Sequence, residues 1–183
     1  MEDNKEKILF YSSNIWSFAE GLFGPLLVVF ADWIGGNILD IAWAWATYLI
    51  ITGLMIMVVG RISDKSLSKE KILLLGLGIN TIFTFSYLLV SSPVHLFIVQ
   101  IGLGIGTALS WPTWDALYSK YQDKDKIGYS WGKVDGAEQI LTGIAIIIGG
   151  IIVTYISFYL LFILMGSVLF ITTIYQAKIL KNN

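Results

Sequence analysis

The chain alternates six long apolar runs with shorter polar segments. A helix that crosses a bilayer needs about 20 predominantly apolar residues, so about 40 in succession must form two helices. The last two runs are divided on this ground near residue 157. The pattern predicts an all-α membrane protein with six transmembrane helices in a single domain, residues 1–183. The expected spans are 8–30, 41–59, 72–90, 94–118, 131–156 and 158–177.

Composition makes a bilayer the natural solvent of this chain. Hydrophobic residues are 56% of the 183 residues and charged residues 14%, against about 25% charged in soluble domains. The net charge of −1 argues against nucleic acid, which requires a basic surface. The sequence has no cysteine and a single histidine, His95, and it shows no nucleophile–base pair. Neither enzymatic activity nor a metal or other cofactor is therefore expected.

The positive charges are confined to alternate polar segments. The twelve Lys and Arg residues lie before the first span, between the second and third, around the start of the fifth, and after the sixth. Six spans place all of these segments on one side of the membrane. Because cytoplasmic segments carry the excess of Lys and Arg, we predict a multi-pass protein of the cell (plasma or inner) membrane with both termini in the cytoplasm.

The first and fourth spans lead two groups of three spans, and both contain residues that interrupt helices. These residues are Gly21, Gly24 and Pro25 in the first span and Gly102, Gly104, Gly106 and Pro112 in the fourth. Interrupted helices at matching positions of two repeats indicate the substrate path of a transporter.

A polar motif, Gly60-Arg61-Ile62-Ser63-Asp64-Lys65, ends the second span, and Lys69 follows it. The motif resembles the cytoplasmic signature of the major facilitator superfamily, from which Leu67 and Ser68 depart. The Gly24-Pro25 pair, the polar segment before the fifth span and the glycines of that span are similar, in order, to the N-terminal half of drug-efflux-type members. The resemblance implies a half-size member: one half of a major facilitator fold, built from two three-helix repeats.

The resemblance also implies a function. The first hypothesis is a secondary active transporter that works by alternating access and exports an apolar or cationic small molecule in exchange for protons. One six-helix half would leave polar groups against lipid at a cost of several kcal/mol each, so a parallel homodimer is expected. Its other partners would be the bilayer, the substrate and protons. The alternatives are a non-transporting scaffold or accessory subunit, and an excised N-terminal half of a twelve-helix transporter.

Glu20 is the main candidate for proton coupling, because it is the ionisable residue nearest the middle of a predicted span. A charge there costs about 2.5–3.5 kcal/mol on insertion scales, so Glu20 should be protonated or face a polar cavity. Ser13 and Ser17 lie on the same helix face and favour the cavity. The alternative is a protonated carboxyl that is hydrogen-bonded to a neighbouring helix.

The fourth span supplies candidates for a cavity wall. Gln100, Thr107, Trp111 and Trp114 follow helical spacing, and aromatic faces suit apolar or cationic substrates. Trp111 and Trp114 would serve equally well as anchors at the membrane interface, the role expected for Trp131.

Two sets of charged residues complete the candidates. The resemblance implies a cytoplasmic gate made of Gly60, Asp64, Lys65, Lys69 and Asp115, unless Asp115 is simply solvated at the membrane edge. Asp135 and Glu138 open the fifth span, where carboxylates stabilise a helix N-terminus. They would otherwise contact the substrate or a partner across the cavity, and so form an interface.

Overall fold

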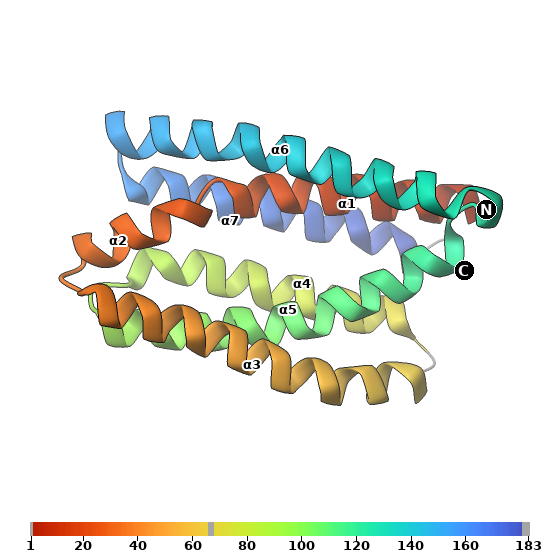
Figure 1. The fold of residues 1–183 in the computed structure, drawn as a ribbon, viewed down its shortest axis with the longest axis horizontal. Coiled ribbons are helices and arrows are strands. Elements are labelled where there is room, and N and C mark those ends of the chain that lie inside the picture. Colours follow the sequence, from red (N-terminus) through yellow and green to blue (C-terminus); the bar gives the residue numbers. More distant parts are fainter. Residues whose placement is uncertain (1, 66–67, 181–183) are drawn as a thin grey trace.

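The computed structural model describes residues 2–65 and 68–180, and all regular structure in these residues is helical (Figure 1). The α-helices are α1 (Glu2–Gly21), α2 (Leu27–Trp33), α3 (Ile38–Lys65), α4 (Lys69–Ser86), α5 (Pro93–Tyr121), α6 (Ile127–Tyr155) and α7 (Phe158–Gln176). Short 3-10 turns adjoin them at Gly24–Leu26, Tyr87–Leu89, Lys124–Lys126 and Ala177–Leu180.

The described residues contain six helical segments that are long and apolar enough to cross a membrane, which confirms the prediction of six transmembrane helices. Their bounds are Asn4–Trp33, Ile38–Arg61, Lys69–Leu89, Pro93–Tyr121, Lys124–Tyr155 and Phe158–Leu180. Several begin earlier or end later than the apolar runs, because a helix continues into polar residues at the membrane surface. Both ends of the drawn chain lie at one end of the bundle (Figure 1), here called the terminal end, and the opposite end is the far end.

The first span is broken near its middle. It consists of α1, the turn Gly24–Leu26 and α2. Pro25 has no N–H to continue the helical ladder, and Leu26 donates to the carbonyl of Phe23 at 2.7 Å in a tighter 3-10 bond. The predicted interruption of the first span is therefore present.

The predicted interruption of the fourth span is wrong. Helix α5 runs without a break through Pro112, and its glycines instead allow neighbouring helices to approach. A methyl group on Gly104 would lie 3.0 Å from the carbonyl oxygen of Tyr48 in α3. Gly106 faces Asn80 of α4, whose fully buried amide hydrogen-bonds to α5 at Thr107. Small residues are commonly used for such close packing in membranes.

The six spans form two equivalent three-helix groups. Helix α1, which leads the first group, packs against α6 and α7 of the second. Helix α5, which leads the second group, packs in the same way against α3 and α4 of the first. Contacts between α4 and α7 join the third members of the two groups. This exchange of neighbours gives an architecture of two three-helix repeats.

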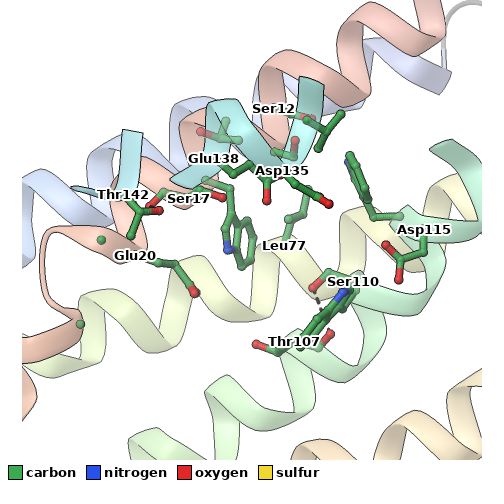
Figure 2. Close-up of a pocket in the computed structure, with 18 of the residues that line it drawn as sticks. Ser12, Ser17, Glu20, Leu77, Thr107, Ser110, Asp115, Asp135, Glu138 and Thr142 are labelled. Atoms are coloured by element: carbon green, nitrogen blue, oxygen red, sulfur yellow. Dashed lines mark hydrogen bonds between the residues drawn. The ribbon is translucent and has the colours of Figure 1, made fainter. Parts of the chain in front are cut away.

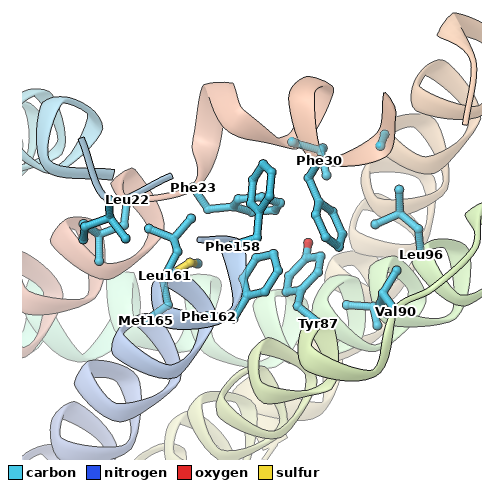
Figure 3. Packing of buried hydrophobic residues seen from close by; sticks show 14 of the residues in the cluster. Leu22, Phe23, Phe30, Tyr87, Val90, Leu96, Phe158, Leu161, Phe162 and Met165 are labelled. Atoms are coloured by element: carbon cyan, nitrogen blue, oxygen red, sulfur yellow. The ribbon is translucent and has the colours of Figure 1, made fainter. Parts of the chain in front are cut away.

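An aromatic cluster fills the far end of the bundle (Figure 3). Phe23, Phe30, Tyr87, Phe158 and Phe162 are all buried. The ring of Phe162 lies 5.1 Å from that of Phe23 and is stacked 5.0 Å from that of Tyr87. Such pairs contribute roughly 0.5–1.5 kcal/mol each beyond the area that they bury. The far end is consequently a solid core.

Candidate functional site

A pocket of about 850 Å³ extends from the break in the first span toward the terminal end (Figure 2). Helices α1, α5 and α6 form its walls, and α3, α4 and α7 contribute single residues or pairs. Its volume lies within the range usual for small-molecule sites, about 300–1,000 Å³. The pocket occupies the half of the bundle that the aromatic cluster leaves open.

The ionisable groups that line the pocket are carboxylic acids, together with the phenol of Tyr48. The carboxylic acids are Glu20, Asp115, Asp135 and Glu138. Among the described residues that line the pocket, none is basic. Asp115, Asp135 and Glu138 are close enough to repel one another electrostatically. The described residues contain no group of three or more such side chains arranged to hold a metal ion.

Glu20 occupies the last turn of α1, immediately before the break. Its side chain is exposed in the pocket and receives a hydrogen bond from the side chain of Trp16, one turn earlier. Its charge also acts on the hydroxyl of Tyr48 in α3. Figure 2 shows Glu20 and Asp115 at opposite ends of the labelled group. Glu20 is therefore set apart from the other three carboxylates.

Asp135 and Glu138 lie in the pocket wall, at the end of α6 nearer the terminal end. Ser13 and Ser17 in α1 lie close to Glu138, and both serines line the pocket, as expected. Thr142, one turn beyond Glu138, donates to the carbonyl oxygen of Ser17 at 3.4 Å. These contacts hold α6 against α1 and fix the position of the carboxylates.

Indole rings form much of the remaining wall. Trp111 and Trp114 line the pocket; Trp111 is 60% exposed, whereas Trp114 stacks on Tyr118 with ring centroids 4.9 Å apart. Trp131, expected at the membrane interface, instead lines the pocket and packs edge-on against Trp114 at 6.2 Å. Trp131 was expected at the start of the span, but α6 already begins at Ile127. Trp131 therefore lies about one turn inside the helix, where it faces the pocket.

The structure separates the two polar residues that were predicted for the cavity wall in α5. Thr107 lines the pocket and accepts a hydrogen bond from the hydroxyl of Tyr48 at 3.3 Å. Gln100 does not line it: the side chain is buried and donates to the hydroxyl of Tyr87 at 3.2 Å. Gln100 and Thr107 share a helix face, but the aromatic cluster fills the space at the level of Gln100. The expectation that Gln100 lines the cavity is wrong.

The gate residues are only partly visible. The side chains of Asp64 and Lys65 lie outside the described residues. Gly60 has open space where a side chain would be, and Lys69 begins α4. Asp115 faces the pocket, where Asp135 is its charged neighbour. The gate remains a prediction.

Several polar pocket residues were not expected, and three of them lie on α1 and α7. Ser12 of α1 and Thr172 and Gln176 of α7 line the floor of the pocket. The hydroxyl of Ser12 donates to the side-chain oxygen of Gln176, and the amide nitrogen of this fully buried glutamine has no partner among the described residues. Polar residues on one face of an otherwise apolar run were the available signal.

Comparisons with known proteins agree with this arrangement. A sequence model of the Major Facilitator Superfamily matches residues 9–182. A separate comparison of the sequence with curated proteins finds no match.

Proposed function

Since this chain belongs to the Major Facilitator Superfamily, whose members are membrane transporters, we propose that it is a proton-coupled exporter of small organic cations. In this proposal two copies of the chain work together by alternating access. The observation that carries the proposal is the combination of carboxylates, without a basic partner, and indole rings in one pocket.

The charge of the pocket favours a cationic substrate. A cation would offset the repulsion among Asp115, Asp135 and Glu138, whereas an anion would meet carboxylates alone among the charged side chains described there. Tryptophan has the aromatic face that attracts cations most strongly, by about 0.5–2 kcal/mol depending on exposure. Trp111 offers such a face, because it is exposed. A flat or apolar cation would use both features.

Proton coupling is assigned to Glu20. A proton and a cationic substrate cannot both neutralise the same carboxylate, so binding of one favours release of the other. Glu20 suits this exchange because it is exposed in the pocket while lying near the middle of the first span.

Homodimer formation is supported by the open side of the pocket. The residues that line it come from one six-helix unit, whereas two such units enclose the cavity in twelve-helix members of the family. The least covered spans are those of α3 and α6, which leaves apolar surface for a second copy or for lipid. The one-sided distribution of Lys and Arg requires both copies to insert in the same orientation, with the termini of each in the cytoplasm.

Liposomes that contain only this protein test the proposal. With an acidic lumen, they should accumulate a fluorescent aromatic cation such as ethidium. Glu20→Gln keeps the shape of the side chain but cannot exchange a proton, so it should fold and dimerise normally and lose proton-driven uptake. Asp135→Asn is the matched control, because it should weaken ethidium binding while uptake still responds to the pH gradient. An unchanged pH response in Glu20→Gln would remove Glu20 from the coupling step. Failure of all uptake would favour an accessory subunit.

A further inference from the structure

The break in the first span leaves main-chain oxygens without hydrogen bonds. A helix would pair the carbonyl of Gly21 with the N–H of residue 25, but Pro25 has none. The N–H of Leu26 turns to Phe23 and so does not reach Leu22. In the described part of the chain, the carbonyls of Gly21 and Leu22 accept no hydrogen bond from the main chain.

The carbonyls of Gly21 and Leu22 have different surroundings. The Leu22 carbonyl rests against Gly149 of α6, so closely that no side chain would fit there. Gly21 lines the pocket, and because glycine has no side chain, this lining is main chain. An unpaired polar group inside a membrane costs several kcal/mol unless a cavity or a ligand satisfies it.

Negative charge gathers at the same point. The last carbonyls of α1, which ends at Gly21, carry partial negative charge, and the positive N-terminal end of α2 at Leu27 offsets part of it. Glu20 adds its carboxylate, and Trp16 donates one hydrogen bond to it, which leaves lone pairs on the carboxylate for another ligand. The hydroxyl oxygen of Tyr48 faces the same pocket.

We propose that Glu20, the carbonyl of Gly21 and the hydroxyl of Tyr48 form a sodium-binding site at the break of the first span. Hard cations prefer oxygen ligands, and the carbonyls of unwound membrane helices are known to supply them. Water in the pocket would complete the coordination. A monovalent ion fits because Glu20 is the single carboxylate at the break, whereas the other three carboxylates interact with one another elsewhere.

The site extends the proposed function, because sodium and protons would compete for Glu20. Sodium binding itself does not require transport. The two ideas can therefore fail independently, and the measurements below separate them.

Purified protein in detergent provides the direct test. Sodium chloride replaces potassium chloride at constant ionic strength, while melting temperature and tryptophan fluorescence are recorded. We expect a saturable rise in melting temperature with sodium, and a fluorescence change because Trp16 contacts Glu20. Glu20→Gln should abolish both responses. Asp32→Asn, a control carboxylate in the same span that does not line the pocket, should retain them.

A second variant alters the carbonyl without altering the charge. Pro25→Ala restores a backbone N–H that can donate a hydrogen bond to the carbonyl oxygen of Gly21. It should weaken sodium binding roughly tenfold, the effect expected for losing one good ligand. Pro112→Ala is the matched control, because Pro112 lies inside the unbroken α5, and it should bind sodium as the wild type does. This pair keeps the test valid if Glu20→Gln does not fold.

Three results would overturn the site: no difference between sodium and potassium, a sodium response that survives Glu20→Gln, or unchanged sodium affinity in Pro25→Ala. Ethidium uptake driven by protons and indifferent to sodium would likewise refute the sodium site and leave the exporter standing. A saturable sodium response in a protein that transports nothing would support the sodium site and refute the proposed exporter.

Discussion

Helices α4 and α5 approach each other so closely at Gly76 that the methyl group added by Gly76→Ala should push them apart. A Cβ atom at this position would lie 2.7 Å from both the carbonyl oxygen of Gly106 and the backbone nitrogen of Ser110. Ordinary van der Waals contacts of a Cβ atom start at 3.4 Å, so the helices must move apart by roughly 0.7 Å. Overpacking of this kind costs about 1–3 kcal/mol, and backbone atoms cannot rotate away as a side chain can.

Gly78 provides the control for Gly76→Ala, because it lies in the same helix with no atom within 4 Å of the added carbon. Gly78→Ala should be neutral or stabilising by up to about 1 kcal/mol, from helix propensity alone. The two variants should thus differ by about 1–4 kcal/mol, which at about 2–4 °C per kcal/mol for a chain of this size corresponds to roughly 2–16 °C in melting temperature. The assay is thermal unfolding in detergent, followed by size-exclusion chromatography. Equal melting temperatures for Gly76→Ala and wild type would refute the close approach.

Three further predictions concern packing, topology and assembly. Asn80→Ala should lower stability by about 1–3 kcal/mol in the same unfolding assay, because its fully buried amide bonds to α5 and its partner would be left unsatisfied. A reporter that is active only in the cytoplasm should give signal when fused to the C-terminus, and an outside signal would contradict the even number of spans. Cysteines introduced at Ser63 and at Ser91 should each cross-link two copies from one side of the membrane only, whereas an antiparallel pair would show both cysteines on both sides.

The fold could be predicted because each span must be apolar over its whole length in a bilayer. Six runs in the sequence therefore became six helical segments in the structure. The ends were less accurate: the fifth span begins at Lys124 rather than residue 131, since hydrogen bonding continues the helix where hydropathy has already fallen. Hydropathy indicates whether a residue lies in lipid or in water, whereas the main-chain hydrogen bonds determine where a helix ends.

The site was predicted where one helix alone determines the direction of a side chain. Thr107 was placed in the pocket in this way, because helical spacing orders the residues of a single face, whereas Glu20 was chosen because a charge inside a span needs a polar surrounding. Gln100 was misplaced and Gln176 was missed for the same reason: which part of a face is hollow depends on side chains from other helices. Phe162 of α7, for instance, helps to fill the space next to Tyr87, the partner of Gln100.

The two prolines within the spans show how tertiary packing decides what a sequence signal means. Pro112 is accommodated in an unbroken α5, whereas the helix ends before Pro25. Gly149 of α6 leaves room for the freed carbonyl of Leu22. The break is thus stabilised by a residue of the other three-helix group. Any movement of α6 relative to α1 would disturb the carbonyls beside Glu20, and we infer that ion binding at the break and the packing of the two groups depend on each other.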